Sequence, residues 1–307
     1  MTDIVLDAAD LTAAPVARDR VLGRLWRHRS GRVGLVLLAV YLIVAVFGPL
    51  MVLWSPSSDV AYQNLFQALK GPSAQHLLGT DQLGRDEMVR LILGARYTLL
   101  IGVGAVALGL VVGVPLGAVS GFYRGWIDLV VQRIVDIVLA FPNFLLALAL
   151  VAVLGPGLRN VIIAVSLASF PRFVRLVRAS VLSVRERPFA EAARAVGVSR
   201  AGVLWRYVVP NCMAPVFVQV PLEVGSAILT AAGLGFLGLG VQQPTPEWGA
   251  MLGQAQNYIF SQSYLVTFPG LCILGAILAF NLLGDGLRDV FDPRVRAVVR
   301  RPKRQAT

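Results

Sequence analysis

The chain has 307 residues, of which 56% are hydrophobic and only 15% are charged, and its mean hydropathy is +0.71. This composition excludes a soluble globular domain, in which about 25% of residues are charged. The formal net charge of +11 would suit a nucleic-acid-binding protein, but the arginines are scattered over four loops beside apolar runs. We therefore attribute the positive charge to membrane topology and expect no nucleic-acid partner.

The N-terminal part of the chain predicts an arm and a first membrane span. Residues 1–33 form a polar arm that ends in six arginines, and the apolar run 34–54 follows. This run is long enough to cross about 30 Å of hydrocarbon, and no small-x-small cleavage site follows it before Trp54. We expect an uncleaved first span, with residues 34–95 holding this span and an outer loop.

Five further apolar runs lie in residues 96–288, before a basic tail at 289–307. Their ranges are 97–122, 137–154, 161–170 with an amphipathic continuation towards Arg178, 214–241 and 265–287. The run from 161 is the least regular, because its uncharged part is short and Pro171 falls near its end. The sequence thus predicts an all-α integral membrane protein with about six transmembrane helices.

The distribution of positive charge predicts the orientation of these spans. On the predicted boundaries, 23 of the 28 lysines and arginines fall in the termini and loops of one side. Because cytoplasmic loops carry the excess of Lys and Arg, we expect both termini and the loop 185–211 to lie in the cytoplasm.

The loop 185–211, here called the polar loop, is rich in arginine, glutamate and alanine and cannot lie in lipid. Glu191, Ala192 and Ala193 precede Gly197, a residue that commonly ends helices, and Pro210 closes the segment. The pattern predicts a short helix with small residues on one surface, which would suit docking into a groove of another protein.

Two glycine patterns indicate close packing rather than chemistry. Gly109, Gly113, Gly117 and Gly121 recur every four residues on one helix face, and we call this face the glycine seam. Residues 233–238 match the dinucleotide-binding fingerprint, but they lie inside a predicted span instead of between a strand and a helix. We assign them to helix packing or a local break.

Four polar residues within the fifth predicted span share one helix stripe. They are Gln219, Glu223, Ser226 and Thr230, here called the polar stripe. A buried glutamate in a membrane helix should face protein or water, so the stripe could line a translocation path. The alternative is that the stripe only makes hydrogen bonds between helices, each worth about 0.6 kcal/mol.

Signatures of enzymes and of metal or cofactor sites are missing from the sequence. It contains no phosphate loop, no zinc-protease helix and no nucleophile elbow, and its two cysteines are far apart. We expect no catalytic residue, metal or cofactor. A secondary transporter remains an alternative, although Glu223 is the one intramembrane carboxylate that we find and no internal repeat is evident.

Several segments together resemble the permeases of ABC importers, and in particular the C-type permease subunit of the oligopeptide, dipeptide and nickel branch. The polar loop is similar to the EAA loop of these permeases, and further similar stretches are 76–86, 236–242 with 244–249, and 280–289 with 292–294. The resemblance covers about residues 20–296.

The resemblance implies a type I importer fold and a role as one permease subunit. It implies a second homologous permease that buries the glycine seam, and an outer solute-binding protein. It also implies two cytoplasmic ATPases that bind through Glu191, Ala192, Ala193, Gly197 and Pro210. ATP would be hydrolysed on the partner chains, in the plasma membrane of a prokaryote. The implied substrates are di- or oligopeptides, with nickel or another small solute as the alternative.

Overall fold

A computed structural model describes residues 23, 25–26 and 28–291 of the chain, and this part is helical throughout its regular elements. The terminal arm and basic tail predicted from the sequence lie largely outside these residues. The long helices are α2 (Arg29–Met51), α3 (Glu87–Tyr123), α6 (Leu158–Val184), α10 (Met213–Phe236) and α12 (Tyr264–Phe291). All five are long and apolar enough to cross a membrane, as expected for an integral membrane protein.

The predicted third span, 137–154, is wrong as a single helix. The structure has two helices there, α4 (Gly125–Leu139) and α5 (Asn143–Leu154), which are bent by 89° relative to each other. Pro142 lies at the break, where it lacks a backbone N–H and disfavours helical geometry in Phe141 before it. The pair makes a sixth crossing only if it is counted as one broken span.

The predicted fourth span, with its amphipathic continuation towards Arg178, ended too early, because α6 runs on to Val184 with Pro171 inside the helix. Three arginines lie on the amphipathic part of this helix. Each is paired with a carboxylate: Arg172 with Glu223, Arg175 with Asp136, and Arg178 with Asp128. The pairs offset the cost of placing these cations on a long apolar helix.

Two other boundaries differ from the predicted ones. Helix α3 begins at Glu87, ten residues before the predicted start, because Asp86 caps it by accepting a hydrogen bond from the Val89 N–H at 3.1 Å. Helix α10 ends at Phe236 instead of 241, and Gly238 follows in a left-handed conformation with φ of 78°. The glycine-rich part of residues 233–238 is therefore a helix end, as the sequence allowed.

The glycine seam lies against α6 of the same chain. A Cβ atom on Gly117 would come within 2.5 Å of the Val174 carbonyl oxygen, and one on Gly121 within 2.8 Å of the Arg178 carbonyl oxygen. The backbones of α3 and α6 thus touch along this line. The expectation that a second permease buries the seam is wrong, because α6 occupies it.

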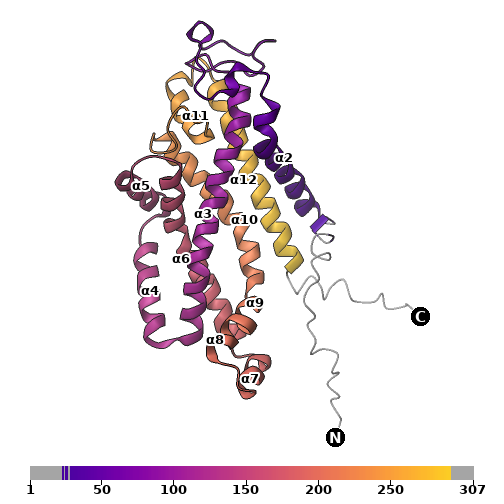
Figure 1. The fold of residues 1–307 in the computed structure, drawn as a ribbon, viewed down its shortest axis with the longest axis vertical. Helices are drawn as coiled ribbons and strands as arrows, with labels where there is room; N and C mark the ends of the chain where they lie inside the picture. Colours follow the sequence, from indigo (N-terminus) through magenta and orange to yellow (C-terminus); the bar gives the residue numbers. More distant parts are fainter. Residues whose placement is uncertain (1–22, 24, 27, 292–307) are drawn as a thin grey trace, which may run out of the picture.

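The molecule has two distinct ends (Figure 1). The segment between α2 and α3 and the short helix α11 (Trp248–Ala255) lie at one end. The short helices α7 (Pro188–Ala195), α8 (Arg200–Gly202) and α9 (Val209–Asn211) lie at the other end, beside the turn between α3 and α4. The polar loop therefore projects from one end of the helix assembly.

Candidate coupling and translocation sites

Helix α7 of the polar loop is defined by strong start and stop signals. Pro188 takes its first position, where a missing N–H is tolerated. At its end, the Gly197 N–H donates to the Arg194 carbonyl at 3.0 Å and the Val198 N–H donates to the Ala193 carbonyl at 3.1 Å. These two bonds form a Schellman cap, which requires the left-handed φ of 86° that Gly197 adopts.

The inner face of α7 packs against the ends of the long helices. Ala190 and Ala193 are buried in a cluster that includes Ala118 of α3 and Val181 of α6. The same cluster holds the first turn of α10 through Val216. Because alanine has almost no side chain, the α7 backbone sits close to these helix ends.

The outer face of α7 is exposed in the part of the chain that the structure describes. Glu191 and Ala192 are exposed, and so is Val196 with 79% of its surface accessible. Glu191 in the first turn and Arg194 in the last turn each carry the charge that the helix dipole favours. The structure thus divides the predicted coupling residues into the buried Ala193, the cap residue Gly197 and the exposed Glu191 and Ala192.

Pro210 lies in a different part of the polar loop, after a wide helical turn. Residues Val203–Val208 form a π-helix, and Pro210 follows it in α9 with its ring exposed. In an α-helix the proline ring would clash with the carbonyl of Arg206, four residues earlier, and the wider turn relieves this conflict.

The polar stripe on α10 is held by an arginine from α6. Glu223 is 3% exposed, and its carboxylate accepts from Arg172 Nη1 at 3.0 and 3.2 Å and from Gln219 Nε2 at 2.9 Å. On the other side of Arg172, its Nη2 lies 2.9 Å from the amide oxygen of Asn143, in the amide orientation that the neighbours of Asn143 require. The network therefore links α5, α6 and α10.

The rest of the polar stripe is less buried. Gln219, Ser226 and Thr230 are half-buried, and the Thr230 hydroxyl donates to the Ser226 carbonyl at 2.9 Å. The structure places the four residues on one side of α10, with Glu223 engaged in an interhelical ion pair. Sequence reasoning singled out Glu223 but not Arg172, whose proximity depends on the helix packing.

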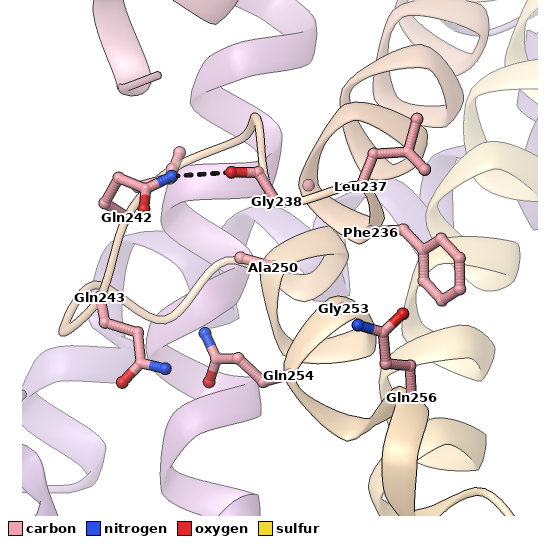
Figure 2. Close-up of a pocket in the computed structure, with 11 residues that line it drawn as sticks. Phe236, Leu237, Gly238, Gln242, Gln243, Ala250, Gly253, Gln254 and Gln256 are labelled. Atoms are coloured by element: carbon pink, nitrogen blue, oxygen red, sulfur yellow. Dashed lines mark hydrogen bonds between the residues drawn. The ribbon is translucent and has the colours of Figure 1, made fainter. Parts of the chain in front are cut away.

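A pocket of about 340 Å³ opens beside the end of α10 (Figure 2). Its polar side chains are four glutamines from the loop after α10, from α11 and from the turn after α11: Gln242, Gln243, Gln254 and Gln256. The nearby Glu247 adds no free carboxylate, because its buried side chain accepts hydrogen bonds from the N–H groups of Gly249 and Ala250 at the start of α11. Burial also raises the pKa of Glu247.

The glutamines offer both donors and acceptors to the pocket. Nε2 of Gln242 donates to the carbonyls of Gly238 and Gly240, which leaves its side-chain oxygen as an acceptor (Figure 2). For Gln254 the roles are reversed, because Arg85 and Arg90 donate to its oxygen at 3.4 Å and leave its NH₂ group free to donate. An uncharged pocket with both functions suits an amide-containing solute.

A buried charged cluster supports this pocket, and the sequence analysis missed its role. Asp81 accepts from Arg85 Nε at 2.6 Å and lies 3.4 Å from Arg90 Nε, and all three side chains are at most 5% exposed. The arginines then reach Gln254 on α11. The signal in the sequence is the density of charges between Asp81 and Arg90, directly before an apolar run.

Long apolar helices, with a short exposed helix at one end and an ion-paired network between α5, α6 and α10, fit the class of membrane permeases. Residues 113–297 match the family described as binding-protein-dependent transport system inner membrane component, and residues 18–72 match the N-terminal transmembrane domain of oligopeptide transport permease C. The chain belongs to this family of ABC-importer permeases, and it is an inner-membrane permease subunit and not an enzyme.

Similar curated proteins agree with this family. The chain is 45% identical over 274 residues to the dipeptide transport system permease protein DppC of Alkalihalophilus pseudofirmus, covering 89% of each chain. It is 46% identical over 272 residues to the di/tripeptide transport system permease protein DppC of Pseudomonas aeruginosa, with 88% of this chain and 90% of that one covered. It is 38% identical over 298 residues to the glutathione transport system permease protein GsiD of Pectobacterium atrosepticum, with 94% and 98% covered.

A solved structure shares the fold. The inward-facing MetNI methionine ABC transporter aligns with a TM-score of 0.56 at 19% identity, covering 67% of this chain and 98% of the matched chain. The type I permease fold predicted from the sequence is therefore confirmed. Membership of the family implies that the permease works with ATPase and substrate-binding partner proteins.

Proposed function

We propose that this permease imports di- or oligopeptides, with a second homologous permease, two cytoplasmic ATPases and an outer solute-binding protein. The observation that carries the mechanism is the construction of α7, which has an exposed outer face and an inner face seated on the ends of α3, α6 and α10. Movement of an ATPase against Glu191 and Ala192 would tilt α7, and with it the long helices, between inward-open and outward-open states.

The proposal includes the orientation that the charges predict. The polar loop and both termini face the cytoplasm, and the end with α11 and the segment between α2 and α3 faces outward. The glutamine-lined pocket then lies towards the outer side, where a released peptide would first meet this subunit. Its amide donors and acceptors match the peptide group, and its neutral lining tolerates varied side chains.

The polar stripe is proposed to line the translocation path. Gln219, Ser226 and Thr230 are half-buried and can contact a polar solute, whereas the Arg172 pair holds Glu223 in place. Cysteines at Gln219 and Thr230 should react with a water-soluble thiol reagent in at least one state of the transport cycle. If they are unreactive in every state, the stripe only packs helices.

The coupling role is tested by measuring ATP hydrolysis and peptide uptake together in proteoliposomes. Glu191→Lys reverses an exposed charge at the docking face and should leave membrane insertion intact while uptake per ATP falls. Charge reversal at the exposed Arg159, at the far end of α6, is the matched control. Normal substrate-stimulated uptake by Glu191→Lys would refute the coupling role.

The substrate is tested separately. Uptake of labelled di- and oligopeptides by cells with and without this subunit should differ, and uptake of nickel should not. A nickel deficit without a peptide deficit would favour the alternative substrate. Proton-coupled transport by the purified chain alone would indicate a secondary transporter instead.

A further inference from the structure

Four arginines surround one cavity at the end of the molecule that carries the polar loop. The cavity holds about 300 Å³ and is lined by Phe122, Tyr123, Arg124, Arg185, Arg194 and Arg200. These residues come from two separate parts of the chain, the turn between α3 and α4 and the segments around α7. None of them belongs to the polar stripe or the glutamine-lined pocket.

The positive charge of this cavity exceeds the negative charge around it. Arg185 pairs with Glu186 at 2.7 Å and also donates to the Phe122 carbonyl, and Arg194 donates to the Arg185 carbonyl. Within the described residues, the guanidinium groups of Arg124 and Arg200 have no hydrogen bond or ion pair. Glu186 is thus the one carboxylate among the residues that the structure describes that pairs with these four cations, and an anion would offset their repulsion.

The strained backbone conformation of Arg124 indicates that its side chain has a role in ligand binding. Its φ of 58° and ψ of −157° form a conformation in which glycine is strongly preferred. Gly125 beside it has φ of 62°, so the chain places an arginine in a strained position directly next to a glycine. Backbone strain of this kind clusters at ligand-binding sites.

The surroundings of the cavity place it at a membrane surface. Helix α4 starts directly after Arg124 and turns a row of large apolar side chains outward: Trp126, Leu129, Val130, Ile134 and Ile137, each 48–74% exposed. Its other side packs inward through Val135 against α6 and carries two polar contacts, with Asp128 paired to Arg178 and Gln132 bonded to Ser120. An outward apolar row that begins with a tryptophan is typical of a helix entering lipid at the headgroup level.

We propose that the arginine cavity binds the phosphate group of an anionic phospholipid. Guanidinium groups recognise phosphate oxygens in bidentate fashion, and basic pockets between membrane helices bind acidic headgroups. The phosphate would bridge Arg124, on the α3–α4 turn, to Arg194 and Arg200, which flank the end of α7 in sequence. An anionic lipid would therefore strengthen the connection between the docking helix and the membrane core, independently of which solute is imported.

The direct test is lipid retention by the purified transporter complex in nanodiscs, measured by native mass spectrometry. The wild-type complex should retain phosphatidylglycerol and not phosphatidylcholine. Arg124→Gly and Arg200→Gln should each weaken phosphatidylglycerol binding roughly fivefold. Arg159→Gln, which removes an exposed arginine at the far end of α6, should leave it unchanged.

The Arg124→Gly variant also controls for folding. Because glycine relieves the left-handed backbone at this position, its thermal stability should equal or exceed that of the wild type, so a loss of lipid cannot be ascribed to misfolding. Unchanged phosphatidylglycerol retention in both variants would overturn the proposal.

Two other outcomes assign the cavity to a different ligand and also overturn the proposal. In phosphatidylcholine nanodiscs, inorganic phosphate could bind with the same dependence on Arg124 and Arg200 while phosphatidylglycerol does not bind, which would indicate a site for free phosphate. Alternatively, both variants could lose the ATPase subunit while lipid retention stays constant, which would indicate an acidic segment of the partner as the occupant.

Discussion

At the residue scale, Glu223 and Arg172 form an ion pair between apolar helices, so the loss of either partner should be destabilising. Replacing Arg172 with methionine leaves a 3% exposed carboxylate with only Gln219 as a partner. Breaking a buried pair costs about 3–5 kcal/mol, and the 40% exposure of Arg172 places the expected cost towards the lower end. Glu223→Gln should cost less, because the amide oxygen still accepts from Arg172.

The measurement is thermal unfolding of the four variants of a double-mutant cycle in detergent. Arg172→Met combined with Glu223→Leu should recover part of the stability lost by Arg172→Met alone, because no unpaired carboxylate remains. Additive effects of the two changes would contradict the importance of the pair.

Gly197 tests the helix cap at the same scale. No atom lies within 4 Å of a Cβ placed there, so the cost of substitution comes from the left-handed φ of 86° and not from crowding. Gly197→Val should lower the ratio of uptake to ATP hydrolysis, because a β-branched residue costs at least about 1–2 kcal/mol in this conformation. Gly197→Asn should retain most coupling, since asparagine tolerates it. Equal effects of the two variants would contradict this explanation.

At the element scale, hydropathy located the spans but not their bends or ends. The apolar run 137–154 resembles one span because hydropathy averages over Pro142, whereas the backbone breaks there. The amphipathic continuation of α6, which carries three arginines, was predicted only towards Arg178, whereas the helix runs on to Val184, because hydropathy does not mark where an amphipathic helix ends. Their carboxylate partners lie on α4 and α10 and could not be known before the packing.

The glycine seam shows how packing distinguishes residues that look equivalent in sequence. Gly117→Ala places a methyl group 2.5 Å from the Val174 carbonyl oxygen, and we expect a loss of about 1–3 kcal/mol as α3 and α6 separate. At Gly109 the nearest atoms are 3.5 Å away or more, so Gly109→Ala should be neutral or stabilising. Thermal unfolding of both variants in detergent checks these two expectations. An equal loss of stability at both positions would contradict the described packing of α3 against α6.

The packing of α7 against the long helices allows a similar comparison between two variants. Ala193→Leu adds volume to a 6% exposed position against α3 and α6 and should lower thermal stability, whereas Ala192→Leu adds it to the exposed face and should not. Both variants should reduce coupled uptake, one by moving α7 and the other by altering its docking surface. Equal thermal stability of the two would show that α7 is not seated as described.

At the scale of the whole molecule, the permease class and the short helix of the polar loop could be predicted from the sequence, since they depend on composition and on local motifs that resemble a known family. The glutamine-lined pocket and the arginine cavity could not. Each combines residues from separate segments, such as Arg124 with Arg200, or Gln254 with Arg85. The sequence contained the residues but not their proximity.

The central claim is that the exposed face of α7 receives an ATPase on the cytoplasmic side. The most direct test places a cysteine at Ala192, with Cys212 and Cys272 replaced by serine, and applies a thiol cross-linker to membranes that hold the assembled transporter. We predict a cross-link to an ATPase subunit in inside-out vesicles and no labelling by an impermeant reagent in intact cells. Labelling from outside, or active transport without any cross-link to an ATPase, would contradict the account.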